Sequence, residues 1–247
     1  MAFDLDGTLA ESKQRVSADM GDLLAQLMSR MPVAVMSGAG FKQFETQLFS
    51  ALPPGTDLRR LYIFPDNAAQ CFVYTNNRWW PQYDKAFSPQ EKQHIVEKLT
   101  AALATVGLAT APVRIWGERI EDRGAEIAFS PLGQQAPLEE KENWHAAHND
   151  IRKRLHEELN KCLPEYANAM GGLTTIDITR KGINKAYGIR RLAEFSHVPI
   201  VDMLYVGDAL EEGGNDAVVL ETGIRTHAVF SPEETAALIR TVLQSRV

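Results

Sequence analysis

Short apolar runs alternate along the chain with stretches that have helical periodicity. One such stretch, from Ser17 to Arg30, places Met20, Leu23, Leu24 and Leu27 on a single helix face. Strands that alternate with helices are typical of a parallel sheet covered by helices. We therefore expect a doubly wound α/β core, whose strands are the apolar runs 2–3, 33–36, 61–64, 203–206 and 226–229.

The middle of the chain departs from this alternation. Ser88, Pro89 and Glu91 carry the signature of a capped helix start, and a longer apolar stripe begins near residue 151. Candidate antiparallel strands lie at 113–118, 124–130 and 173–178. This pattern predicts an inserted α+β cap domain at 85–178, within a core formed by 1–84 and 179–247.

Charge and composition exclude several classes of partner. The chain of 247 residues has 26 Lys and Arg against 32 Asp and Glu, a net charge of -6. A net negative surface repels nucleic acid and anionic membranes, so we expect neither as a general partner. The chain contains no apolar run near the roughly 20 residues that span a bilayer. Two cysteines without a pairing pattern favour a reducing, cytoplasmic compartment.

The first apolar run is unusually short. Only Ala2 and Phe3 precede Asp4, whereas strands commonly have about 5 residues. Either the chain is trimmed or its start is misassigned, and the sequence leaves both readings open.

The segment Phe3-Asp4-Leu5-Asp6-Gly7-Thr8 places two carboxylates at the end of an apolar strand. Successive strand residues alternate in direction with period two, so the turn at Gly7 must re-aim the second carboxylate. Such a pair suits two tasks, in which Asp4 attacks phosphorus and Asp6 moves a proton. The alternative is a simple turn at a strand end, which Asp-Gly pairs commonly form.

A second acidic segment follows a later strand. Asp208 comes directly after the run 203–206, and Gly213, Gly214, Asn215 and Asp216 follow it. Parallel α/β sheets bind their ligands at the carboxyl ends of strands, so Asp4 and Asp208 are expected to meet there. Carboxylates gathered in one cleft need a cation, and Mg²⁺ suits hard oxygen ligands. A helix cap by Asn215 or Asp216 is the alternative, and it is compatible with the metal site.

Two further segments suit a phosphate group. Ser37 offers a hydroxyl, and Gly38 exposes backbone N–H groups after the second strand. Lys185 is predicted in the first turn of a helix, where a cation opposes the helix dipole and so indicates another role. Lys181 is the competing candidate, and we favour Lys185.

Taken together, the four segments resemble the motifs of the haloacid-dehalogenase (HAD) superfamily in order and spacing. The resemblance implies that Asp4 forms a phosphoaspartate and that Asp6 is the acid–base partner. It also implies that Ser37 and Lys185 bind the phosphoryl group. Mg²⁺ would be held by Asp4, the main-chain carbonyl of Asp6 and Asp208, with support from Asp216, while Gly38 and Asn215 would contact the substrate.

Within that superfamily, nearly the whole chain resembles the phosphomannomutases. The resemblance implies sugar-phosphate binding by Arg123, Gln134, Lys141, Thr175 and Asp177 in a cap that closes over the site. Dimerisation through the cap is a further expectation. The family carries three cap arginines for the distal phosphate, whereas this chain keeps Arg123 and has Gln134 and Lys141 in place of the others.

That difference affects the expected reaction. A mutase must hold a bisphosphate while it reorients, and arginine does this better than lysine or glutamine. We therefore expect a Mg²⁺-dependent phosphatase acting on a small sugar phosphate, ahead of a phosphomannomutase-like mutase. A protein that binds metal and phosphate without turnover is the third alternative.

Three other features are given ordinary structural explanations. His145 and His148 are expected on a solvated helix face, because no third ligand of fitting spacing is visible. The basic run 152–154 is expected to be exposed and paired with Glu157 and Glu158. Trp79 and Trp80 are expected to pack where the two domains join.

Overall fold

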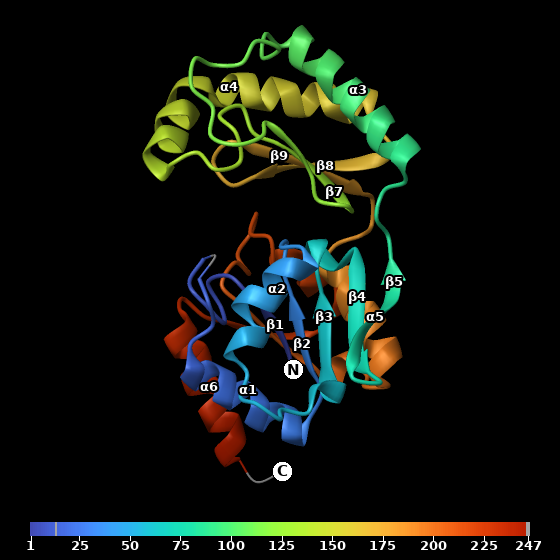
Figure 1. Ribbon diagram of the computed structural model, residues 1–247, viewed down its shortest axis with the longest axis vertical. Coiled ribbons are helices and arrows are strands. Elements are labelled where there is room, and N and C mark those ends of the chain that lie inside the picture. The colour runs from blue at the N-terminus through green and yellow to red at the C-terminus, as the bar shows by residue number, and fades with distance from the viewer. Residues whose placement is uncertain (13, 246–247) are drawn as a thin grey trace. The chain divides into compact units, whose positions relative to one another are not determined.

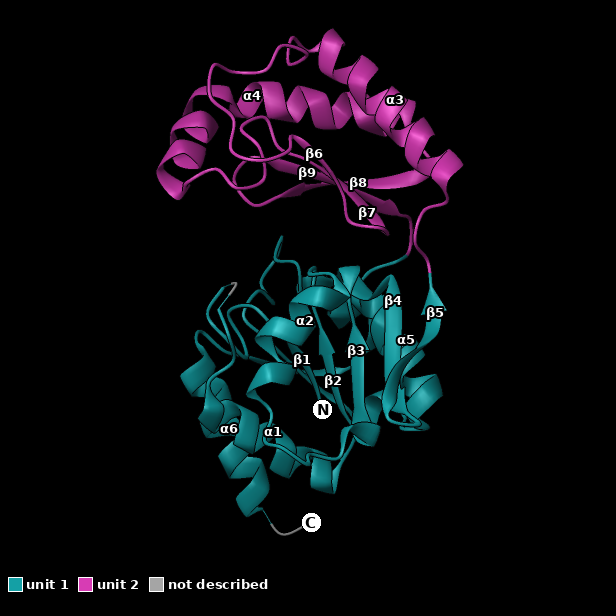
Figure 2. Ribbon diagram, viewed as in Figure 1, with its two compact units in different colours: residues 1–84, 183–247 teal, residues 85–182 magenta. Residues whose placement is uncertain are grey.

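The computed structural model describes residues 1–12 and 14–245. The chain divides into two compact units (Figure 2). The core unit comprises residues 1–84 and 183–247, and the inserted unit comprises residues 85–182. The second boundary lies four residues beyond the expected position 178, because a strand that begins at Thr175 continues to Arg180.

The core unit is built on a seven-stranded sheet with the order β11-β10-β1-β2-β3-β4-β5 (Figure 1). Its parallel strands are β1 (Ala2–Asp4), β2 (Val33–Met36), β3 (Leu61–Phe64), β10 (Leu204–Gly207) and β11 (Arg225–Ala228). The order reverses on either side of β1, which is the point where such sheets bind ligands. The predicted doubly wound α/β core is confirmed.

Helices cover both faces of this sheet, because successive strand residues point to opposite sides. On one face Phe3, Val35 and Ile63 pack with α1 (Ala18–Arg30), α2 (Phe41–Gln47) and α6 (Pro232–Gln244). On the other face Met36 and Phe64 pack with α5 (Lys185–Ser196). In Figure 1, α1 and α6 lie side by side, away from α5.

An antiparallel hairpin extends the sheet and was not predicted. It consists of β4 (Gln70–Thr75) and β5 (Arg78–Asp84), joined through Asn76 and Asn77 with positive φ. Trp79 stacks on Phe49 with ring centroids 4.6 Å apart, so it packs within the core unit and not where the units join. Its neighbour Trp80 is half exposed under the Arg78 guanidinium.

The inserted unit has a four-stranded antiparallel sheet with the order β6-β7-β9-β8. These strands are β6 (Ile120–Asp122), β7 (Glu126–Phe129), β8 (Tyr166–Gly171) and β9 (Thr175–Arg180). Two helices, α3 (Pro89–Thr105) and α4 (Leu138–Cys162), pack on one face of this sheet (Figure 2). The α+β character is as expected.

Several local expectations for the chain differ from the structure. Residues 113–118 form no strand, and the strand β8 was not expected. The expected capping box at Ser88 is present. At the start of α6 the Ser231 side chain makes no cap, and Glu234 accepts from the Phe230 N–H. Short 3₁₀ turns complete the fold at Phe49–Ala51, Leu58–Arg60, Asp66–Ala68, Ile200–Asp202 and Ala217–Thr222.

Across the part of the chain that the structure describes, no helix has the length and apolar character needed to cross a bilayer.

One ion pair fastens the two ends of the inserted unit to each other. Both guanidinium ends of Arg180 donate to Glu91, at 2.7 and 2.8 Å, and the same side chain donates to the carbonyls of Lys85 and Ala86. The ion pair with Arg180, and then the hydrogen bonds from Ser88, lower the pKa of Glu91 to about 2. The last strand is thereby tied to the residues that lead into the first helix.

We predict that Glu91→Gln destabilises the inserted unit at neutral pH by up to about 1 kcal/mol, because glutamine keeps the cap acceptor but loses the ion pair. A carboxyl group whose pKa is lowered by folding contributes stability above its unfolded value of 4.5. That contribution is lost as the pH falls toward 2. Amide hydrogen exchange in α3 should therefore be faster in the variant at pH 7 and equal to the parent near pH 2.

Glu97→Gln, on the exposed side of the same helix, is the matched control and should change little. An equal effect of Glu91→Gln at both pH values would show that the ion pair is not the cause.

Candidate active site

Asp4 is the last residue of β1 and lies at the centre of the core sheet. Its backbone is in register with Met36 of β2, so Ser37 follows immediately on the neighbouring strand. The Asp4 side chain is buried, and burial raises its pKa to about 7, with Lys185 opposing the shift and Asp216 adding to it. The Asp4 carboxylate and the Ser37 hydroxyl are therefore placed together at the carboxyl edge of the sheet.

The turn after Asp4 re-aims the next carboxylate. Gly7 donates its N–H to the carbonyl of Ala10 at 2.7 Å and has φ of +81°. A side chain at Gly7 would overlap the Asp208 carboxylate, so glycine is required here for two reasons. Asp6 is half-buried, and its Oδ1 accepts from Gln47 Nε2 at 3.3 Å. Its acid–base role remains a prediction.

Lys185 is the most deeply buried cation near Asp4, with 1% of its surface exposed. It begins α5, directly after the N-cap Asn184. Its Nζ donates to Asp4 Oδ1 at 2.5 Å and to Asp216 Oδ1 at 2.6 Å. Burial alone would lower its pKa, but the two carboxylates raise it overall, so the side chain stays charged. The competing candidate Lys181 donates to the Pro164 carbonyl in the inserted unit.

The acidic segment after β10 brings two more carboxylates to Asp4. Carboxylate oxygens of Asp4, Asp208 and Asp216 all lie within 4.8 Å of one another. Thr8 Oγ1 donates to Asp208 Oδ1 at 3.4 Å, and the N–H of Ala209 donates to Asp216 Oδ2 at 3.3 Å. Asp216 precedes a 3₁₀ turn but forms no side-chain cap, and Asn215 is exposed in the same loop.

This cluster fits a divalent cation. Three carboxylates share one ammonium, and burial followed by repulsion from Asp216 raises the pKa of Asp208. Uncompensated acidic oxygens at this spacing are the donor set that Mg²⁺ prefers. Within residues 1–12 and 14–245, no other group of His, Cys, Asp or Glu has such an arrangement.

The loop after β2 has the shape of a phosphate cradle. Ser37 is buried, its Oγ accepts from the Ala39 N–H at 3.0 Å, and its own N–H donates to the Phe64 carbonyl at 3.1 Å. A Cβ at Gly38 would lie 3.3 Å from Nδ2 of Asn67. Asn67 thus packs against the backbone of this loop.

The turn that carries Asn67 is strained and was not recognised as part of the site. Asp66, Asn67 and Ala68 have φ of 51°, 53° and 66°, three consecutive residues in the left-handed region. For alanine this conformation costs about 1–2 kcal/mol. The Asn67 N–H donates to the Ser37 carbonyl at 2.9 Å, which ties the turn to the cradle. Asparagine tolerates this conformation and was a usable signal, whereas Ala68 gave none.

The residues expected to bind sugar phosphate in the inserted unit are already engaged with their own neighbours. Arg123 Nε donates to Glu121 at 2.5 Å, its NH1 to Glu126 at 2.6 Å and its NH2 to Gln134 Oε1 at 3.2 Å. Gln134 also donates from Nε2 to the Ala128 carbonyl at 3.2 Å. Glu126 is buried, and the Arg123 guanidinium compensates its charge.

The remaining three expected residues lie on β9 and α4. Thr175 Oγ1 donates to the Gly171 carbonyl at 2.5 Å, and Asp177 Oδ1 is buried with no hydrogen-bond donor. Burial raises the pKa of Asp177, and Arg123 and Arg152 partly offset that shift. Lys141 lies in the first turn of α4. Their roles toward a substrate remain predictions.

The basic run at 152–154 contains an unexpected buried residue. Arg152 is 5% exposed and donates to the carbonyls of Gly171, Gly172, Leu173 and Thr175, where an exposed salt-bridged residue was expected. It therefore holds the turn between β8 and β9 in place, immediately beside Thr175.

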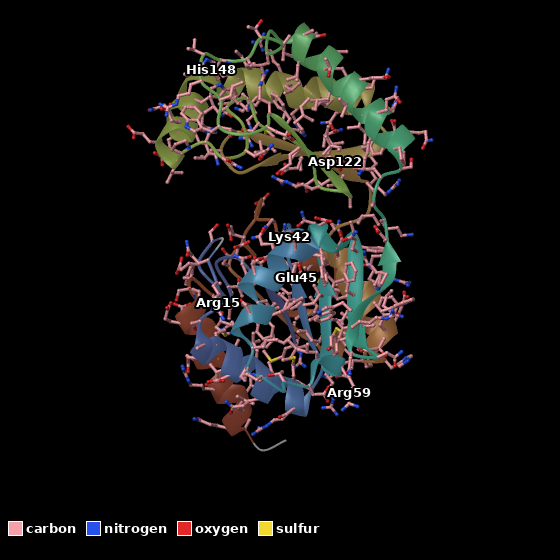
Figure 3. All side chains as sticks on the ribbon, in the orientation of Figure 1. Arg15, Lys42, Glu45, Arg59, Asp122 and His148 are labelled. Atoms are coloured by element: carbon pink, nitrogen blue, oxygen red, sulfur yellow. The ribbon has the colours of Figure 1, made fainter. Side chains whose placement is uncertain are left out.

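The two histidines on α4 have structural partners. Nδ1 of His145 lies 2.9 Å from the Leu173 carbonyl oxygen, and His148 stacks on Trp144 with ring centroids 5.1 Å apart. His148 is labelled in Figure 3, on the long helix of the inserted unit. Both are half-buried, so the expected solvated face is only partly correct.

Residues 20–245 match the family described as eukaryotic phosphomannomutase. A probable phosphomannomutase of Caenorhabditis elegans is 26% identical over 99% of this chain and 95% of its own length. A phosphomannomutase of Dendrobium officinale is 28% identical over 95% of this chain and 90% of its own length.

Solved structures show the same fold at lower identity. IMP-nucleotidase of Plasmodium falciparum with bound IMP aligns with a TM-score of 0.68 and 17% identity, over 99% of this chain and 68% of that chain. A trehalose-6-phosphate phosphatase related protein aligns with a TM-score of 0.56 and 15% identity, over 98% and 96% of the two chains. These structures support the predicted α/β fold with an inserted cap, and the family match over residues 20–245 supports the predicted phosphomannomutase relationship.

We predict that Asp208→Asn weakens Mg²⁺ binding at least about tenfold, the scale of loss seen when even outer partners of a metal are removed. The metal-free variant should be no less stable than the parent, because one repelling charge is gone. Calorimetric titration gives the affinity, and thermal unfolding with and without Mg²⁺ gives the stability.

Asp202→Asn, an exposed aspartate just before β10, is the control and should bind Mg²⁺ as the parent does. If Mg²⁺ stabilised Asp208→Asn as strongly as the parent, Asp208 would not be a ligand.

Proposed function

The chain belongs to the eukaryotic phosphomannomutase family, and from this premise we propose that it transfers the phosphoryl group of a sugar phosphate through Asp4. The observation that carries the proposal is the buried contact of the Lys185 ammonium with Asp4, at 2.5 Å. A carboxylate held in this way is fixed in orientation at the strand end, and an adjacent ammonium can bind an incoming phosphoryl oxygen.

The reaction would proceed in two balanced steps. An Asp4 oxygen attacks phosphorus, the bond from phosphorus to the sugar oxygen breaks, and Asp6 gives that oxygen a proton. In the second step an acceptor hydroxyl attacks the phosphoaspartate, returns a proton to Asp6 and frees Asp4. The Ser37 hydroxyl and the N–H group of Gly38 would hold the phosphoryl oxygens in both steps.

A bound Mg²⁺ would neutralise charge on the phosphoryl group. Asp4, Asp208 and the main-chain carbonyl of Asp6 would hold it, with Asp216 behind them. The donor set supports Mg²⁺, as hard carboxylate and carbonyl oxygens do in other phosphoryl-transfer sites.

The relatives favour a mutase over a hydrolase. The curated relatives that align along almost the whole chain are called phosphomannomutases, which reverses the order expected from the sequence. In a mutase the second acceptor is another hydroxyl of the same sugar, so the phosphoryl group moves between two positions. We therefore place phosphomannomutase-type transfer first.

Hydrolysis is the second candidate, and the state of Arg123 favours it. A mutase must hold the phosphate at the far end of a bisphosphate, which carries nearly two negative charges at neutral pH. Arg123 already donates to Glu121, Glu126 and Gln134, so its guanidinium donors are shared with acceptors of its own unit. A weak hold on the bisphosphate would let water compete for the phosphoaspartate.

We predict that Asp4→Asn lowers turnover by at least about a thousandfold, because asparagine is not a nucleophile toward phosphorus. The assay supplies a hexose 1-phosphate, a catalytic amount of hexose bisphosphate and Mg²⁺, and measures both hexose 6-phosphate and free phosphate. A mutase gives mainly the 6-phosphate, whereas a phosphatase gives free sugar and phosphate.

Asp19→Asn, an exposed aspartate on α1, is the control and should keep full activity. Equal product formation by Asp4→Asn and the parent would exclude the phosphoaspartate. Binding of Mg²⁺ and phosphate without any product would instead indicate the non-enzymatic alternative.

A further inference from the structure

Tyr205 is a fully buried tyrosine whose hydroxyl contacts the active-site residue Asp216. It lies in the middle of β10, beside Ala2 of β1, and its ring packs on the α5 side of the sheet. Its hydroxyl donates to Asp216 Oδ1 at 2.6 Å. The proposed reaction assigns this group no role.

The hydroxyl and the Lys185 ammonium share one oxygen of Asp216. Oδ1 accepts from Lys185 at 2.6 Å and from Tyr205 at 2.6 Å, while Oδ2 accepts from the Ala209 N–H. Three donors on separate elements, namely α5, β10 and the loop after it, thus fix this fully buried carboxylate. Its orientation in turn sets where the ammonium lies.

Gly207 makes the contact between Tyr205 and Asp216 sterically allowed. Strand residues two apart point to the same face, so Gly207 is the next position above the tyrosine ring. A Cβ there would overlap the Asp216 carboxylate and lie 2.9 Å from Cε1 of Tyr205. The absence of a side chain at Gly207 leaves the space that this hydrogen bond crosses.

The Tyr205 hydroxyl also affects how the three N–H donors of the Lys185 ammonium are shared between Asp4 and Asp216. An ammonium has three N–H donors, and Lys185 uses one for Asp4 and one for Asp216. With Tyr205 as a second donor, Asp216 needs only one hydrogen bond from the lysine. The third N–H then stays available for a phosphoryl oxygen. Burial, followed by the Asp216 charge, raises the pKa of Tyr205 well above its usual value, so the hydroxyl remains a donor.

We propose that Tyr205 is a positioning residue, whose hydroxyl holds Asp216 so that the Lys185 ammonium lies against Asp4 with one N–H directed to the substrate. This inference rests on the proposed function for its effect on turnover. Its structural part, the placement of the ammonium, does not depend on which reaction the protein performs.

The test compares Tyr205→Phe with the parent in two measurements. In the metal-free protein, the ¹⁵N resonance of the Lys185 ammonium, assigned with Lys185→Arg, should shift in Tyr205→Phe. In the Mg²⁺-loaded protein, kcat should fall about tenfold while KM changes less than about twofold, because the lost hydrogen bond positions a group that acts in the transition state.

Tyr83→Phe is the matched control. Tyr83 also belongs to the core cluster on the α5 side, and its hydroxyl donates to the Ala68 carbonyl at 2.8 Å, without contact to Asp4, Lys185 or Asp216. It should lose comparable stability but keep the parent's kcat and its Lys185 resonance. Gly207→Ala is a second variant that displaces Asp216 without removing a donor, and it should reproduce the effects of Tyr205→Phe.

An unchanged Lys185 resonance and kcat in both Tyr205→Phe and Gly207→Ala would overturn the proposal and leave Tyr205 as a core hydrogen bond. Failure of the proposed function has a different signature. In that case the parent itself forms no product, while the resonance still reports whether Tyr205 positions the ammonium.

Discussion

The buried ammonium of Lys185 is the interaction on which the rest of the site depends. It binds two carboxylates, Asp4 and Asp216, that are themselves buried. The lysine compensates acidic groups that burial disfavours, and it joins α5 to β1 and to the loop after β10. The edge of the sheet where these elements meet is therefore held together by the same charges that are proposed to carry out the chemistry.

The core unit and the inserted unit handle charge in opposite ways. Beside β1, carboxylates outnumber the cation, which leaves room for a metal. On the sheet of the inserted unit, Arg123 is surrounded by acceptors from its own unit. The family relationship favours a mutase, whereas the engagement of Arg123 favours hydrolysis. The two inferences concern different parts of the chain, and the identity of the product decides between them.

Much of the fold and of the site could be predicted because the signals are local. A carboxylate that ends an apolar run, as Asp4 does, and a cation in the first turn of a helix, as Lys185 is, are visible in the sequence. The hairpin β4–β5 was missed because Trp79, Trp80 and Pro81 do not alternate in polarity. Arg152 was misjudged and Tyr205 was not noticed, since their partners are backbone carbonyls and a distant carboxylate that only the folded chain brings near.

The ion pair between Arg180 and Glu91 joins the beginning of the inserted unit to its end. Near its end, Arg180 binds the Glu91 side chain and the carbonyls of Lys85 and Ala86 near its beginning, so the two ends of the inserted unit lie next to each other. A segment whose ends are joined in this way, and which has its own hydrophobic core, depends little on the core sheet for its fold. Such a segment can therefore be exchanged or reshaped in evolution while the residues around Asp4 stay as they are.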